Sequence, residues 1–194
     1  DFGFDLVKID ETRFVTLASS GLVLMDLSIV VWKFVETQMN GVSTFLLFPF
    51  GKGWGGVGER VGVQVAYPDH FGTVIRDLSG ILKILIWKTD PNDGVVTLLS
   101  KYEMEAPLSL IAAVPFKEQT IAVISRTAQK KLHFTVLNIA RNSKTLKITI
   151  ELTNNEDRLI GDTTSAFCGS LVKKSQPILV TAYRSIENGG IVKL

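Results

Sequence analysis

A glycine-rich stretch is the first part of this sequence whose residue types and spacing could do chemistry. Residues 51–62 read GKGWGGVGERVG, and Gly51 to Gly56 satisfy the G-x-G-x-x-G spacing of dinucleotide-binding loops. Such a loop works because its glycines follow a strand and open a helix whose N–H groups face the pyrophosphate. Further glycines and alternating valines follow here, and Gly costs about 1 kcal/mol relative to Ala inside a helix. The Walker form fails too, because Lys52 precedes Gly53 rather than Ser or Thr. We predict an insertion between strands at residues 39–60 and no nucleotide cofactor.

Side chains that could catalyse a reaction or bind a metal are few and scattered. The chain has two histidines, His70 and His133, and one cysteine, Cys168. A metal site needs three or four clustered ligands, so this set is too small to indicate one. The acidic segment at 90–94, DPNDG, lacks the ligand spacing of a calcium loop and is explained by turn chemistry. We predict no catalytic residue, no cofactor and no metal. A propeller-fold enzyme stays open as an alternative if Asp77, His70 or His133 meet in a deep pocket.

Strand patterns account for most of the chain, whereas few segments have apolar residues at helical spacing. Four units read as a strand, a short polar turn and a second strand. Their turns fall near residues 20, 80, 129 and 187, at intervals of about 60, 49 and 58 residues. Repeats of this length, each a small antiparallel sheet, are typical of propeller blades. We predict an all-β fold in which residues 1–194 form about four blades of a divergent β-propeller, within a longer chain.

The segments between these hairpins can complete the blades. Residues 93–104 read as the outer strand of one blade, and residues 106–116 as the inner strand of the next. Residues 143–152 alternate apolar and polar side chains, as a half-exposed outer strand does. Residues 44–48 could form a strand or start a short helix. A β-sandwich remains the alternative fold, because it also has many short strands at regular spacing.

Composition and charge narrow the class of partner. Apolar residues make up 46% of the chain and the net charge is only +2, so we expect a globular core and no electrostatic attraction to nucleic acid or acidic membranes. A single cysteine excludes an internal disulfide framework and fits the cytosol or nucleus. No apolar run reaches the roughly 18 residues of a membrane span. Proteins are the remaining class of partner, and membrane contact would be at most peripheral.

Exposed aromatic side chains are the candidate contacts for such partners, because interface hot spots are rich in them. Phe48, Phe50 and Trp54 flank the expected insertion. Two of them, Phe48 and Phe50, could equally belong to the core. We list all three as possible partner contacts.

The order of segments over residues 4–90 resembles one family. Ser20-Gly21-Leu22 matches a hairpin turn, Phe48 to Gly51 matches a "LFPW"-like segment, and Ile75 to Asp77 followed by Ile86-Trp87 matches a second hairpin. The segments resemble the N-terminal propeller of the large Y-complex scaffold nucleoporins. That family has a hundred-and-sixty-kilodalton member in vertebrates and a hundred-and-twenty-kilodalton member in yeasts.

The resemblance implies a structural role without catalysis at the nuclear envelope, in nucleocytoplasmic and mRNA transport. The propeller would dock on neighbouring nucleoporins and on a helical domain of its own chain. The alternative is a propeller subunit of a vesicle-coat, tethering or kinetochore complex, with a cytoplasmic location. Both readings predict that loops and blade rims bind other proteins.

Overall fold

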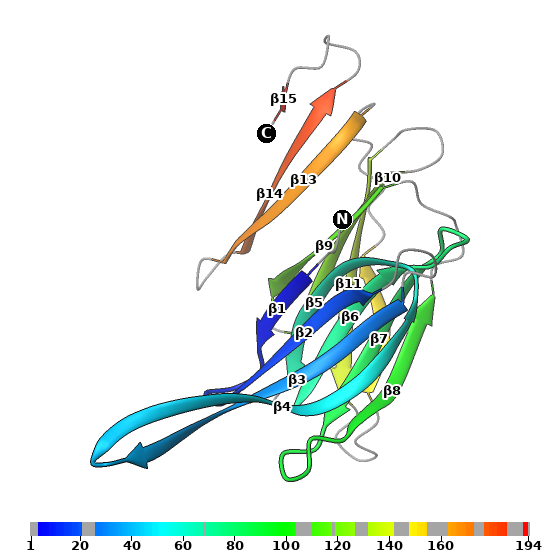
Figure 1. Ribbon diagram of the computed structural model, residues 1–194. Coiled ribbons are helices and arrows are strands. Elements are labelled where there is room, and N and C mark those ends of the chain that lie inside the picture. The colour runs from blue at the N-terminus through cyan, green and yellow to red at the C-terminus, as the bar shows by residue number, and fades with distance from the viewer. Residues whose placement is uncertain are drawn as a thin grey trace.

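The computed structural model contains strands and, among the residues that it describes, no helix (Figure 1). The described residues are 4–20, 26–67, 69–103, 110–117, 119–126, 132–141, 148–154, 163–172, 177–185 and 192–193. All strand pairs are antiparallel. The predicted all-β class is confirmed.

The strands form four sheets, and each sheet takes its strands in unbroken sequence order. The first sheet holds β1 (Phe4–Lys8), β2 (Arg13–Ser20), β3 (Asp26–Met39) and β4 (Val42–Val57). The second holds β5 (Glu59–Tyr67), β6 (His70–Arg76), β7 (Leu82–Thr89) and β8 (Val96–Glu103). The third holds β9 (Leu110–Lys117), β10 (Thr120–Arg126), β11 (Leu132–Arg141) and β12 (Ile148–Asn154). The fourth holds β13 (Thr163–Val172), β14 (Pro177–Ser185) and β15 (Val192–Lys193).

The four predicted strand–turn–strand units are the pairs β2–β3, β6–β7, β10–β11 and β14–β15. The segments expected as outer strands are β8 and β12, which lie at the far edges of the second and third sheets. The segment expected as the inner strand of the next blade is β9, the first strand of the third sheet. Three of the four predicted turns lie outside the described part of the chain, at residues 21–25, 127–131 and 186–191.

Residues 39–60 are mainly strand, which corrects the expected insertion. Strand β4 covers residues 42–57 and pairs with β3 along its length. Residues 44–48, for which a helix was possible, belong to this strand. Two register shifts in the pairing let the glycine-rich half of β4 follow the twisted sheet. The pattern of glycines suggested a loop because Gly usually weakens a strand.

The side chains that the structure describes form two apolar core layers between successive sheets. One layer joins buried residues of the first and second sheets: Ile9, Val15, Leu17, Leu27, Ile29, Val31, Phe71, Ile75, Leu85 and Trp87. The next layer joins the second and third sheets: Val74, Leu82, Ile84, Ile86, Ile121, Val123, Leu137 and Ile139. The second sheet is therefore covered on both faces, which explains why every residue of β6 from His70 to Ile75 is buried instead of every second one.

Successive sheets contact each other at matching strands. Strand β5 contacts β1 and β2 on one side and β9 on the other, and β9 contacts β13. At the opposite edges, β4 contacts β8 and β8 contacts β12. The sheets therefore follow one another in a row, first strand to first strand and last strand to last strand (Figure 1).

One backbone hydrogen bond recurs in the first three sheets at the same place. The residue that precedes the second strand accepts a hydrogen bond from an N–H of the third strand. The donor directly follows the last residue of the third strand that pairs with the second strand. The three bonds are Phe34 N to Thr12 O (2.7 Å), Thr89 N to Asp69 O (2.8 Å) and Ile139 N to Gln119 O (2.7 Å). The recurrence aligns the sheets residue by residue, so that each is a copy of one structural repeat.

Candidate protein-contact surface

A two-stranded ribbon projects from the first sheet. Strand β2 stops pairing with β3 at Lys33, whereas β3 and β4 continue to pair as far as Met39 and Val42. We call residues 34–47 the hairpin arm; it extends beyond the other sheets at the lower left of Figure 1. Asn40 and Gly41 close it with φ values of +52° and +78°, as a two-residue type I′ turn requires.

The hairpin arm exposes large apolar side chains that are normally buried. The exposed ones are Met39, Val42, Phe45, Leu46 and Leu47. Phe45 stacks on Phe34 with ring centroids 4.9 Å apart, so part of the arm is held by its own aromatic contact. A cluster of exposed apolar residues of this kind on one segment is typical of a protein-contact site.

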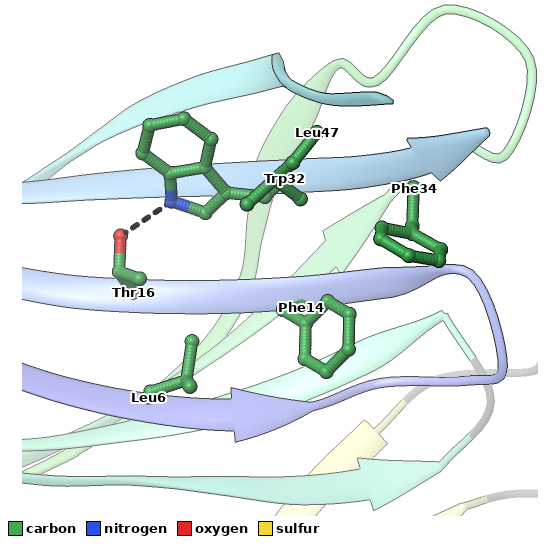
Figure 2. A pocket seen from close by; sticks show the side chains of 6 residues that line it. All are labelled: Leu6, Phe14, Thr16, Trp32, Phe34 and Leu47. Carbon is green, nitrogen blue, oxygen red and sulfur yellow. Dashed lines mark hydrogen bonds between the residues drawn. The ribbon is translucent and has the colours of Figure 1, made fainter. Parts of the chain in front are cut away.

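A groove of about 450 Å³ continues from the arm onto the body of the first sheet (Figure 2). Its lining residues are Leu6, Phe14, Thr16, Trp32, Phe34 and Leu47. The one polar side chain among them is Thr16, whose Oγ1 accepts a hydrogen bond of 3.0 Å from Trp32 Nε1. We call this side of the sheet the groove face; it is opposite to the face that packs on the second sheet.

The three aromatic residues predicted as partner contacts have different environments. Trp54 is 64% exposed and, because it pairs with Ser28, lies on the groove face as Trp32 does. Phe48 is 40% exposed. Phe50 is half-buried against the core, with Lys33 Nζ 4.7 Å from its ring centroid. Trp54 and Phe48 are therefore available to a partner, whereas Phe50 mainly supports the fold.

Sequence reasoning missed the hairpin arm, although the sequence carries a signal for it. Asn40-Gly41 is the strongest short-range hairpin dipeptide, and β-branched and aromatic residues flank it. The glycines at 51–56 drew the prediction of an insertion across this turn. The structure brings the predicted Phe48 and Trp54 together with the arm on one long strand, β4.

A buried arginine ties the first sheet to the second near this surface. Arg13 Nε donates to Asp10 Oδ2 at 2.7 Å, and its Nη2 pairs with Asp69, which precedes β6. Burial alone would raise the pKa of Asp10, but hydrogen bonds from Thr12 and Arg13 outweigh it and lower that pKa. This cluster fixes the relative position of two sheets and contains no nucleophile.

Asp77, named as a possible catalytic residue, has a turn role instead. Its Oδ1 accepts hydrogen bonds from Ser79 N (2.9 Å) and Ile81 N (2.9 Å), and its Oδ2 pairs with Lys83 Nζ (2.9 Å). His70 begins β6 and Asp77 follows the end of that strand, so the two residues lie at opposite ends of it. The side chains of His133 and Cys168 lie outside the described part of the structure.

Metal sites, membrane-spanning helices and similar proteins are the remaining indicators of function. Among the described residues, no group of three or more His, Cys, Asp or Glu side chains could hold a metal ion. The described part also contains no helix long and apolar enough to cross a membrane. No protein-family model and no curated protein matches the sequence.

Proposed function

We propose that the chain is part of a β-propeller that acts as a structural scaffold, without catalysis, in a large protein assembly. The exposed apolar hairpin arm carries this proposal, because large apolar side chains gathered on one exposed segment are typical of a protein-contact site. The nuclear pore coat is the assembly that we favour, and the resemblance of residues 4–90 to the Y-complex scaffold nucleoporins is the reason.

The arrangement of the sheets supports a propeller over a sandwich. A sandwich has two sheets that face each other, whereas here a row of small sheets contact at matching strands. Each sheet runs in sequence order from one edge of the row to the other, as a blade does from the axis to the rim. In that arrangement β4 is a rim strand, and the hairpin arm extends it outward.

The arm suits a partner protein for two reasons. Its aromatic and aliphatic side chains would gain free energy on burial, at about 25 cal/mol per Å² of apolar surface. Its backbone is already ordered by pairing from Phe34–Leu47 to Met39–Val42, so binding would not have to order a loop. We place Phe45 and Leu46 at the centre of the contact.

A shortened arm tests the scaffold role. Deleting residues 36–39 and 42–45 joins Val35 to Leu46 through the original Asn40-Gly41 turn. Val35 pairs with Leu46, so this deletion keeps the register of the remaining ribbon. We expect an unchanged melting temperature and at least a tenfold loss of affinity for the partner complex.

A matched substitution controls for general loss of apolar surface. Leu78 is 69% exposed at the turn between β6 and β7, so Leu78→Ser should leave association unchanged while Leu46→Ser weakens it. Pull-down of the full-length protein identifies the assembly: recovery of Y-complex nucleoporins supports the nuclear pore, and recovery of tethering or spindle proteins supports the alternative complexes. Normal assembly of the shortened protein would refute the contact role of the arm.

A further inference from the structure

The groove face is the repeat counterpart of a face that the structure shows covered. Phe14 pairs with Trp32 in the first sheet, and Phe71 pairs with Trp87 in the second. In both sheets the pairing of the third strand with the fourth shifts register immediately before the tryptophan, between Val31 and Trp32 in β3 and between Ile86 and Trp87 in β7. The groove face and the Phe71–Trp87 face are thus equivalent positions of one repeat.

The correspondence extends to side-chain hydrogen bonds. Trp32 Nε1 donates to Thr16 Oγ1 at 3.0 Å, and Trp87 Nε1 donates to Thr73 Oγ1 at 2.9 Å. Thr73 is fully buried and Trp87 is buried, whereas Trp32 lines the open groove. The same tryptophan–threonine hydrogen bond is therefore buried in the second sheet and lies at an open groove in the first.

The residues at the edge of the groove also have buried counterparts in the second sheet. Leu47 pairs with Phe34 in the first sheet, and Val96 pairs with Thr89 in the second. Val96 packs against the core layer between the two sheets, whereas its counterpart Leu47 is exposed. Phe34 and Leu47 are larger than Thr89 and Val96, so the groove face presents more apolar surface than its covered counterpart.

The first sheet covers the face of the second sheet that carries Trp87. The cover is the aliphatic side of a four-stranded antiparallel sheet, and its buried residues are Val15, Leu17, Leu27, Ile29 and Val31. A charged cover would fit the groove itself poorly, because Thr16 is the one polar side chain among the residues that line it. Its hydroxyl already accepts a hydrogen bond from Trp32 and donates one to Val30 O at 3.4 Å. The chemistry of the cover is therefore an aliphatic sheet face.

We propose that the groove face is the docking surface for a further antiparallel sheet of the same polypeptide, outside residues 1–194, which presents aliphatic side chains to Phe14 and Trp32. This inference depends on the ring arrangement proposed above and not on the scaffold role. Phe34 and Leu47, at the base of the hairpin arm, line the groove. Residues 35–46 of the arm extend past the end of the repeat, so they remain free for a partner when the groove is covered.

Cysteine labelling tests this docking surface. Leu6→Cys and Leu47→Cys place one thiol at each side of the groove, in a Cys168→Ser background. Each variant is made in the chain of residues 1–194 and in the full-length protein, and maleimide labelling rates are followed by mass spectrometry. We expect labelling to be at least tenfold slower in the full-length protein at both positions.

Leu78→Cys is the control, because it lies on a turn away from the groove and should label equally fast in both chains. Equal rates for Leu6→Cys in the two chains would overturn the proposal. Slow labelling in residues 1–194 alone, with a dimer mass by light scattering, would also overturn it, because a second copy would then cover the groove. Either result leaves the arm-shortening experiment unaffected, so the two proposals fail separately.

Discussion

Gly51 and Gly94 lie in backbone contact where the edge of the first sheet meets the second. A Cβ atom built on Gly51 would stand 1.9 Å from the carbonyl oxygen of Gly94. In the other direction, a Cβ on Gly94 would stand 2.2 Å from Phe50 O, and Gly94 has a φ of +76°. Glycine at both positions therefore lets the two backbones approach each other.

Gly51→Ala is expected to destabilise the protein by about 1–3 kcal/mol, because the new methyl group meets backbone atoms that cannot rotate away. Urea denaturation followed by circular dichroism measures the change. Lys52→Ala is the control, since its side chain is exposed on the same strand. If both variants were equally stable, the close approach would be wrong.

The two equivalent tryptophans should differ in their effect on stability. Trp87→Ala removes a buried ring and should cost about 3–5 kcal/mol of unfolding free energy. Trp32→Ala in residues 1–194 should cost roughly half as much, because one side of that ring faces the open groove. Equal losses in denaturant titrations of the two variants would show that the groove is covered in this chain.

Asp69→Asn tests the tie between the first two sheets. Asp69 has a φ of +65°, which Asn tolerates, so the substitution changes charge with little backbone strain. Arg13 would keep Asp10 but lose one buried ionic partner, and we expect a loss of about 1–2 kcal/mol. Asp93→Asn, on an exposed turn, should change the stability by less than about 0.5 kcal/mol.

The turn aspartate Asp77 should make stability depend on pH in the acid range. Burial alone would raise its pKa, but hydrogen bonds from Ser79 and Ile81 and the ammonium of Lys83 lower it from 3.8 to about 2. Because the folded state binds this proton less tightly than the unfolded chain, the stabilisation is complete above about pH 4 and is lost as the pH falls through about 2. We expect on the order of 1 kcal/mol from this group.

Thermal melting of the wild type and Asp77→Asn between pH 7 and pH 2 measures this contribution. The variant should melt lower at neutral pH, since it cannot form the ion pair with Lys83. The two melting curves should converge near pH 2, where the wild-type carboxyl is protonated. A constant difference at all pH values would assign the effect to the turn hydrogen bonds alone.

Local sequence patterns identified most strands, because residues close in the chain define alternation and turn chemistry. The β6–β7 hairpin is an example: apolar strands flank an Asp-Leu-Ser-Gly turn, and Asp77 accepts the backbone bonds of that turn. The same reasoning failed at residues 39–60, where it weighed five glycines above the Asn40-Gly41 turn. The reason for Gly51 lies in Gly94, and that for Gly58 in the backbone of Arg76; both partners are distant in sequence.

The sequence by itself determined the all-β class, the hairpin units and the small number of histidines and cysteines, since these depend on composition and local pattern. Only the tertiary structure decided which aromatic residues are buried. Phe14 and Phe71 each pair with a tryptophan and each stand two residues before a threonine, but Phe71 is covered by a second sheet and Phe14 lines an open groove. Burial of a sheet face depends on which sheet packs against it, and that contact is formed by residues far apart in the chain.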